Sequence, residues 1–340
     1  MTTSTTMPIE ETPIEERALL SVRDLVVEFP VGKGQTVHAV SGVSFEVRAG
    51  ETLGLVGESG SGKSTIARTL VRMEEATSGS ILLEGEDLGS LDGKELRKVR
   101  RRFQMIFQDP ISSLNPRRRV VDIVAEPLAI WKEGTPASRR EQASKLLAQV
   151  GIDPDTVGRR RPLELSGGQC QRVSIARALA LDPRVVICDE PVSALDVSVQ
   201  AQVLNLLEDL KQQRQLTLIF VAHDLAVVKN VSDRVAVTYL GRFCELAPAE
   251  SLYEAPLHPY TRALLDAIPE APTEEDPDEA KLAVPLSGEI PSPLDPPSGC
   301  RFRTRCPRAT SLCAAEVPEW REIRSDHWIA CHFPLDQTHE

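Results

Sequence analysis

The sequence predicts an α/β fold with a parallel sheet, and three apolar segments lead to this prediction. The segments at 51–57, 184–190 and 216–223 have the length of buried strands, and helical patterns separate them. Strands that alternate with helices form βα units, whose strands pair in parallel. With 340 residues, 41% of them hydrophobic, the chain is long enough for one large domain or two smaller ones.

The elements follow one another in an order that fits this fold. Residues 1–17 are rich in Thr, Pro and Glu and predict a disordered lead-in. Residues 18–50 alternate in character and contain several valines, which predicts β-structure. Helices are expected at 63–73, directly after the first apolar strand, and at 139–151, where a glycine ends a segment with helical spacing.

The composition changes after about residue 245. Eight prolines and an acidic run occur between 269 and 297, which predicts a linker or an extended arm rather than a helix. A compact segment with four cysteines follows this arm. The predicted divisions are a lead-in (1–17), a main domain (18–245), a proline-rich region (246–297) and a cysteine-bearing tail (298–340).

Charge and composition exclude several classes of protein. The net charge is −11, whereas sequence-independent binding of nucleic acid needs a basic surface, so no nucleic-acid partner is expected. No apolar run approaches the 18 residues of a membrane-spanning helix, and the N-terminus lacks the features of a secretory signal. Seven cysteines without such a signal favour a cytosolic metal or thiol role over a disulfide framework.

The first candidate site follows the strand at 51–57. The segment GESGSGKST matches the pattern G-x-x-x-x-G-K-[ST], whose glycines let backbone N–H groups face phosphate oxygens. Lys63 would reach the β- and γ-phosphates, and the Ser64 hydroxyl would bind Mg²⁺. The predicted phosphate site consists of Gly57, Glu58, Ser59, Gly60, Ser61, Gly62, Lys63, Ser64 and Thr65.

A second candidate site ends the apolar strand VVICDE. Asp189 and Glu190 would lie at the C-terminal edge of the sheet, where ligands bind in open α/β folds. Asp189 would hold the Mg²⁺ shell, and Glu190 would polarise the attacking water. A strand followed by an exposed acidic turn is the alternative, and the preceding phosphate motif makes it the weaker of the two interpretations.

The segment LSGGQCQR, at 165–172, resembles the signature loop of the nucleotide-binding subunits of ABC transporters. Other landmarks of that family occur in the same order. The resemblance covers about 18–245 and implies a P-loop NTPase domain with a mixed β core, a RecA-like sheet and a helical subdomain near 109–180. Four further residues match family positions: Gln108 of the Q-loop, Asp196 of the D-loop, the switch residue His223, and Phe29, where the family has an aromatic that stacks on adenine.

This resemblance implies an ATPase that works as a head-to-tail dimer. Two such domains enclose two ATP molecules, and the signature loop of one domain contacts the γ-phosphate held by the other. Catalysis would rest on Glu190, His223 and Gln108, with Gln108 also near Mg²⁺. The signature residues expected at the nucleotide are Ser166, Gly167, Gly168 and Gln169.

The C-terminal third is similar to one branch of that family. The segments at 256–269 and 287–309 resemble the ATPases of oligopeptide and dipeptide importers, and the F-type second ATPase most of all. The resemblance implies a peripheral subunit at the cytoplasmic face of the cell membrane that powers peptide uptake. Its partners would be two transmembrane permeases, a second ABC ATPase and an extracytoplasmic binding protein. The alternatives are a soluble ABC ATPase in translation or DNA repair, an exporter subunit, an ATP-binding module without turnover, and an importer of another solute such as nickel chelates.

Four cysteines in the tail suggest a metal that stabilises it. Cys300, Cys306, Cys313 and Cys331 are separated by five, six and seventeen residues, which are not the C-x₂-C pairs of a zinc finger. The resemblance to importer ATPases implies a [4Fe–4S] cluster, which suits four thiolate ligands. Zinc, or free thiols, are the alternatives.

Overall fold

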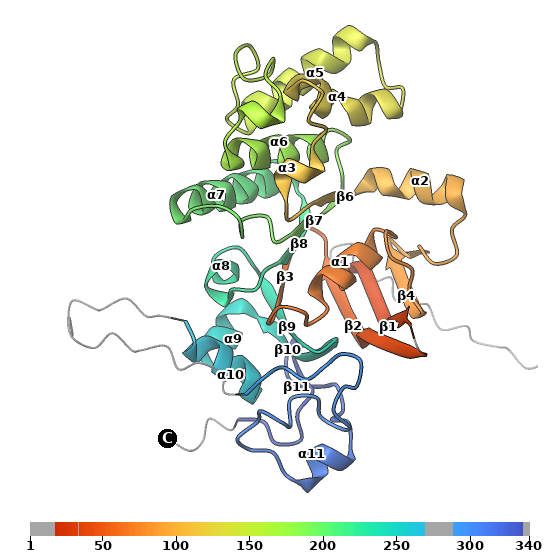
Figure 1. The fold of residues 1–340 in the computed structure, drawn as a ribbon, viewed down its shortest axis with the longest axis vertical. Helices are drawn as coiled ribbons and strands as arrows, with labels where there is room; N and C mark the ends of the chain where they lie inside the picture. The colour runs from red at the N-terminus through yellow and green to blue at the C-terminus, as the bar shows by residue number, and fades with distance from the viewer. Residues whose placement is uncertain (1–17, 33, 269–287, 336–340) are drawn as a thin grey trace, which may run out of the picture.

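The computed structural model describes residues 18–32, 34–268 and 288–335. Two β-sheets form the centre of the molecule, a helical lobe lies at one end, and the C-terminal region lies at the other (Figure 1). The predicted lead-in at 1–17 and most of the proline-rich arm, 269–287, lie outside the described residues.

The smaller sheet is antiparallel and has the strand order β2-β1-β4-β5. Its two long strands pair along most of their length, so the β-structure predicted for 18–50 is confirmed. The strands are β1 (Ala18–Val31), β2 (Gln35–Arg48), β4 (Ser78–Leu83) and β5 (Glu86–Asp87).

The larger sheet has the order β11-β12-β10-β9-β3-β8-β7-β6, and its strands from β9 to β6 are parallel. Every residue of the three predicted apolar strands, β3, β7 and β8, is buried, which is the pattern of strands covered on both faces. The strands are β3 (Thr52–Val56), β6 (Phe103–Ile106), β7 (Val185–Asp189), β8 (Thr217–Val221), β9 (Arg234–Tyr239), β10 (Arg242–Pro248), β11 (Arg321–Arg324) and β12 (His327–Ile329).

Two groups of helices accompany the sheets. The lobe of α3 to α6 spans 110–179, close to the helical subdomain expected at 109–180, and packs through the apolar faces of α4, α5 and α6. Its helices are α3 (Pro110–Ser113), α4 (Val120–Ile130), α5 (Pro136–Gln149) and α6 (Gly167–Leu179). The other helices are α1 (Lys63–Leu70), α2 (Gly93–Arg102), α7 (Val197–Arg214), α8 (Leu225–Lys229), α9 (Ala249–Glu254), α10 (Pro259–Asp266) and α11 (Ser311–Ala315).

The tail continues the larger sheet. The boundary predicted at residue 245 falls inside β10, and the hairpin β11–β12 pairs with β10 through β12. Glu245 is fully buried and joins three segments, because its carboxylate accepts the N–H groups of Leu257 (2.7 Å) and His258 (3.0 Å) and contacts His327 Nε2 at 2.7 Å. Burial lowers the pKa of His258 to about 4, so this imidazole is neutral at physiological pH.

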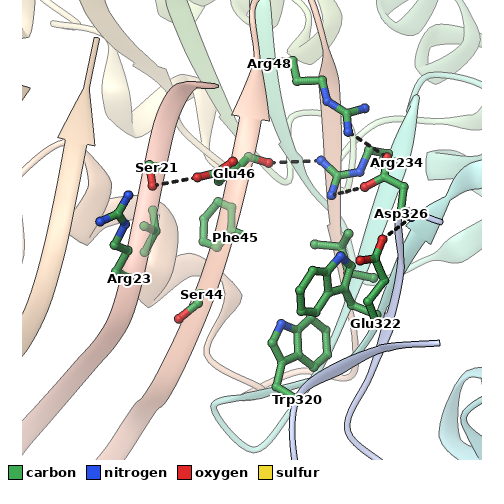
Figure 2. A pocket seen from close by; sticks show the side chains of 13 residues that line it. Ser21, Arg23, Ser44, Phe45, Glu46, Arg48, Arg234, Trp320, Glu322 and Asp326 are labelled. Atoms are coloured by element: carbon green, nitrogen blue, oxygen red, sulfur yellow. Dashed lines mark hydrogen bonds and ion pairs between the residues drawn. The ribbon is translucent and has the colours of Figure 1, made fainter. Parts of the chain in front are cut away.

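A cavity of about 480 Å³ lies where the hairpin β11–β12 faces β1 and β2 (Figure 2). Trp320 and Trp328 stack with their ring centroids 6.2 Å apart, and Trp320 packs on Phe243, which contacts Phe45. The aromatic side chains of the hairpin region therefore pack on Phe243 of the larger sheet, and Phe243 in turn contacts Phe45 of the smaller sheet.

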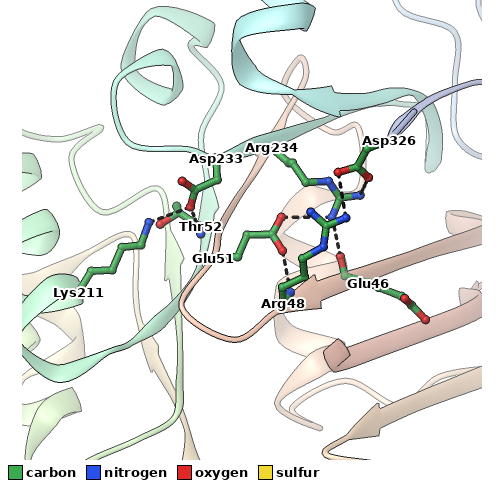
Figure 3. A network of polar contacts seen from close by, with 8 residues as sticks. All are labelled: Glu46, Arg48, Glu51, Thr52, Lys211, Asp233, Arg234 and Asp326. Atoms are coloured by element: carbon green, nitrogen blue, oxygen red, sulfur yellow. Dashed lines mark hydrogen bonds and ion pairs between the residues drawn. The ribbon is translucent and has the colours of Figure 1, made fainter. Parts of the chain in front are cut away.

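A buried ion network ties the same hairpin to the edge of the central sheet (Figure 3). Arg234, at the start of β9, contacts Glu51 at 3.2 Å and Asp326 of the hairpin turn at 3.0 Å. Arg48 contacts the second Asp326 oxygen at 3.0 Å. The side chains of Arg234 and Glu51 are only 9% and 5% exposed. Each charge is therefore stabilised by its ion partner rather than by water.

No helix in the described part of the chain has both the length and the apolar character needed to cross a membrane.

Removing the central arginine of this network should destabilise the protein. Arg234→Met leaves Glu51 buried without its ion partner, and we expect the free energy of unfolding in urea to fall by about 3 kcal/mol. The control is Lys145→Met, which removes an exposed pair with Glu141 and should leave the unfolding midpoint unchanged. Equal midpoints for the two variants would show that the network adds no stability.

Candidate nucleotide-binding site

The predicted phosphate loop connects β3 to α1 and needs glycine at two positions. Gly57 has φ +148°, and a Cβ there would lie 2.1 Å from the carbonyl oxygen of Thr238. Gly62 has φ +101°, and its Cβ would lie 2.3 Å from the carbonyl oxygen of Ala39. Any side chain at either position would collide with backbone, so the loop can follow this path only with glycine.

Lys63 lies inside the loop. Its Nζ donates to the carbonyl oxygens of Gly57 (2.7 Å) and Glu58 (2.9 Å) and lies 3.4 Å from Ser61 Oγ. Burial lowers the pKa of Lys63. None of the described carboxylates forms an ion pair with this ammonium, so it remains available to an anion that enters the loop.

The rest of the predicted loop frames this lysine. Ser59 and Gly60 are exposed at the tip, Ser61 is buried beneath it, and Thr65 lies in the first turn of α1. Backbone N–H groups at the start of a helix favour phosphate. The loop therefore has the shape and the donors of a phosphate site, as the sequence predicts.

Ser64 and Asp189 form the predicted Mg²⁺ position. Ser64 Oγ donates to Asp189 Oδ1 at 2.8 Å, and Arg68 approaches the second oxygen at 3.8 Å. Burial raises the pKa of Asp189. A hydroxyl and a carboxylate are oxygen ligands that suit Mg²⁺, which commonly completes its coordination with phosphate and water.

The three predicted catalytic side chains meet at the end of β7. Gln108 Nε2 donates to Glu190 Oε2 at 2.9 Å, and His223 Nδ1 lies 3.5 Å from the same oxygen. Glu190 has φ +47°, a conformation that costs energy for a residue other than glycine. Its N–H donates to Val221 of β8, so the adjacent strand holds it in this conformation.

The signature loop begins α6. Ser166 and Gln169 form a reciprocal cap: Ser166 Oγ accepts the Gln169 N–H at 3.3 Å, and Gln169 Oε1 accepts the Ser166 N–H at 3.1 Å. Gly167 and Gly168 form the first turn. No hydrogen bond in the described chain joins this loop to the phosphate loop of the same molecule.

Two other predicted nucleotide residues have structural contacts. Asp196 is the N-cap of α7, where its carboxylate accepts the Val199 N–H at 3.0 Å, and hydrogen bonds lower its pKa. Phe29 is half-buried in β1 opposite Val37 and packs on the core of the smaller sheet. Neither residue contacts the phosphate loop in the described structure.

Two residues outside the sequence motifs, Tyr260 and Arg305, touch the loop. The Glu58 N–H donates to Tyr260 Oη at 3.0 Å, and the Arg305 guanidinium contacts both Glu58 oxygens, at 2.6 and 3.1 Å. The sequence carries no signal for Arg305. Tyr260 belongs to the segment at 256–269, in which His258 caps α10 and Pro259 is the first residue of that helix.

The four tail cysteines line one small cavity, together with His258 and Phe302. Its volume is about 10 Å³, roughly the room of one water molecule. In the described residues, no group of three or more His, Cys, Asp or Glu side chains is placed to hold a metal ion. The geometry therefore does not support the expected [4Fe–4S] cluster, although one cavity is lined by Cys300, Cys306, Cys313 and Cys331.

Comparison with known proteins identifies two family regions. The family described as ABC transporter matches residues 40–193, which contain the phosphate loop, Asp189 and Glu190. The family described as oligopeptide/dipeptide transporter, C-terminal region, matches residues 244–313.

Relatives match nearly the whole chain. A putative peptide import ATP-binding protein of Brucella ovis is 52% identical over 93% of this chain and 98% of its own. Oligopeptide transport ATP-binding protein AppF of Bacillus subtilis is 48% identical over 95% of this chain and 99% of its own. A dimeric ATP-binding cassette bound to ADP and Pi is 28% identical, with a TM-score of 0.62, and covers 68% of this chain and 98% of its own.

The backbone conformation of Glu190 generates a prediction about stability. Glu190→Asn and Glu190→Gln remove the same charge, but asparagine tolerates positive φ better than glutamine. We expect the Asn variant to be more stable to urea by about 0.5 kcal/mol. If the Gln variant is equally stable, the strain at this position is negligible.

Proposed function

Because this chain belongs to the ABC transporter family, we propose that it is the ATP-hydrolysing subunit that powers peptide uptake through a membrane importer. The observation that carries this proposal is the near full-length match to peptide import and oligopeptide transport ATP-binding proteins, including the separate C-terminal region. That region favours the importer over a soluble ABC ATPase in translation or DNA repair.

The residues of the site would have separate roles in ATP hydrolysis. Lys63 would bind the β- and γ-phosphates, and Ser64 and Asp189 would hold Mg²⁺. When bound, the metal would neutralise charge on the phosphates. Glu190 accepts a proton from water as the water oxygen attacks the γ-phosphorus, and the bond to the β-phosphate oxygen breaks. Gln108 and His223, both within 3.5 Å of Glu190, orient that water and the γ-phosphate.

The signature loop would serve a second subunit. Ser166, Gly167 and Gly168 present the N-terminus of a 13-residue helix, and such a terminus favours phosphate. Within the described residues, no hydrogen bond joins this loop to the phosphate loop of the same chain. A head-to-tail dimer would give it a partner, with Asp196 and Gln169 at the junction. Phe29 would stack on the adenine. A similar cassette has been solved as a dimer bound to ADP and Pi.

The importer would contain further subunits. We propose that this chain is the F-type ATPase of the importer. A second ABC ATPase would be its dimer partner, and two transmembrane permeases and an extracytoplasmic substrate-binding protein would complete the complex. This chain would lie at the cytoplasmic face of the membrane as a peripheral subunit. Support comes from the relatives named as peptide import ATP-binding proteins, since an ATP-binding subunit needs a separate membrane path for its substrate.

Glu190→Gln should abolish turnover but not binding. In the complex purified through a tag on this chain, we expect ATPase activity to fall by roughly a hundredfold or more, since the general base is lost. The affinity for a fluorescent ATP analogue should stay within about twofold. Phosphate release and uptake of a labelled tripeptide by cells are the two measurements.

The control for this experiment is Glu208→Gln, a partly exposed glutamate of α7 outside the site. Equal ATPase rates for the wild type and Glu190→Gln would remove Glu190 from catalysis. Lost ATPase with unchanged tripeptide uptake would separate this chain from peptide import.

We also propose that the four tail thiolates hold a [4Fe–4S] cluster, as sequence analysis expects. The support is chemical: the four cysteines line one cavity, and four thiolates are the usual ligands of such a cluster. The cavity would have to widen, because a cluster needs more than 10 Å³. When bound, the cluster would link segments on both sides of α11 and so stabilise the tail.

Anaerobic purification tests the cluster. We expect about four iron and four sulfide per chain, with broad visible absorption. Cys306→Ser should lose most of both, while Cys170→Ser, a buried cysteine of α6, should retain them. Stoichiometric zinc, or protein free of metal, would disprove the cluster.

A further inference from the structure

Three side chains of the C-terminal region reach the phosphate loop or its support, and ATP hydrolysis assigns them no step. They are Tyr260, Arg301 and Arg305, and all three fall within the region matched by the separate C-terminal family, residues 244–313. A segment far along the sequence therefore contacts the loop that begins at Gly57.

Arg305 makes the strongest of these contacts. Its guanidinium binds both oxygens of Glu58, at 2.6 and 3.1 Å, and its side chain is only 3% exposed. It also lies 5.8 Å from the ring centroid of Tyr239. The hydrogen bonds to Glu58 raise the pKa of Arg305, so the charge is permanent. The Glu58 side chain is 25% exposed, so the pair is partly buried. A two-point pair with one partner almost fully buried sets the position of both partners more strictly than an exposed one-point pair does.

The same glutamate is held through its backbone, and this links the tail to Lys63. The Glu58 N–H donates to Tyr260 Oη at 3.0 Å, and the Glu58 carbonyl oxygen accepts from Lys63 Nζ at 2.9 Å. The side chain, the N–H and the C=O of Glu58 are therefore all occupied. If Glu58 moves, one of the two carbonyl oxygens that hold the lysine moves with it.

Arg301 supports the other end of the loop. It donates to the carbonyl oxygen of Leu240 and to Ser41 Oγ at 2.9 Å. The neighbouring Gly241 N–H donates to the Ser61 carbonyl oxygen at 2.8 Å, so this support reaches the loop through one residue. Between the two arginines, Phe302 packs edge-on against Tyr239, with ring centroids 5.3 Å apart.

We propose that Arg305 is a positioning residue of the ATP site, acting through Glu58 to hold the phosphate loop and Lys63 in the conformation that binds nucleotide. This inference rests on the proposed ATPase function and adds to it. The tail then contributes to ATP affinity as well as to the stability of the fold. If the tail served only the stability of the fold, an ion pair between Arg305 and a residue of the phosphate loop would not be required.

The test measures nucleotide affinity in the full-length protein. Arg305→Gln should weaken binding of a fluorescent ATP analogue roughly three- to tenfold, because one of the charged contacts that order the loop is lost. The KM for ATP should rise by a similar factor, and kcat should fall less than KM rises. Arg305→Lys keeps the charge and should recover part of the affinity.

A double-mutant cycle separates positioning from loss of structure. Glu58→Gln removes the same ion pair by changing its other partner. The losses should therefore not add: the double variant should bind ATP as tightly as whichever single variant has the lower affinity. The control is Arg303→Gln in the same turn, which contacts Ser298 within the tail and not the phosphate loop, and it should bind ATP like the wild type.

Three results would overturn the proposal: unchanged affinity in Arg305→Gln, an equal loss in Arg303→Gln, or additive losses in the double variant. A wild-type protein that binds no ATP would instead contradict the proposed function. The two failures are therefore distinguishable in one experiment.

Discussion

The site depends on one constraint: a lysine ammonium is buried inside a loop and held by the carbonyl oxygens of that loop. Lys63 is 4% exposed and contacts the backbone of Gly57 and Glu58. A buried cation without a carboxylate is costly, and an entering phosphate supplies the missing negative charge. The conformation of the loop is thus complementary to a phosphate, and the fold has to hold the loop in that conformation.

The parallel sheet holds the phosphate loop in this conformation. Strands β3, β7 and β8 are fully buried, and their C-terminal ends deliver the phosphate loop, Asp189 with Glu190, and His223 to one edge. Burial has electrostatic consequences at that edge, since it raises the pKa of Asp189 and lowers that of Lys63. A bound phosphate would stabilise the charged form of Lys63, and a bound metal ion would stabilise the charged form of Asp189.

The C-terminal region contacts the same parallel sheet and the phosphate loop. It adds two strands to the larger sheet, joins the strand edge through Arg234 and Asp326, and meets the phosphate loop through Tyr260 and Arg305. The two sets of contacts lie at opposite ends of β3: Thr52 follows the ion network and Gly57 begins the phosphate loop. The central strand is therefore braced at both ends by residues that come late in the chain.

The sequence alone determined the parts of the site whose chemistry is local. The spacing of the glycines, Lys63 and Ser64 specifies a phosphate loop between a strand and a helix. The apolar strand that ends in Asp189 and Glu190 specifies the edge of the sheet at which this loop lies. Tertiary structure decided the rest. Arg305 is 247 residues from Glu58, and Asp326 is 278 from Arg48, so no periodicity could reveal either pair. The cysteine spacing likewise could not show how much room the four thiols enclose. Charge pairs and cavities between distant segments arise only when the sheet brings those segments together, and that is a property of packing rather than of local sequence.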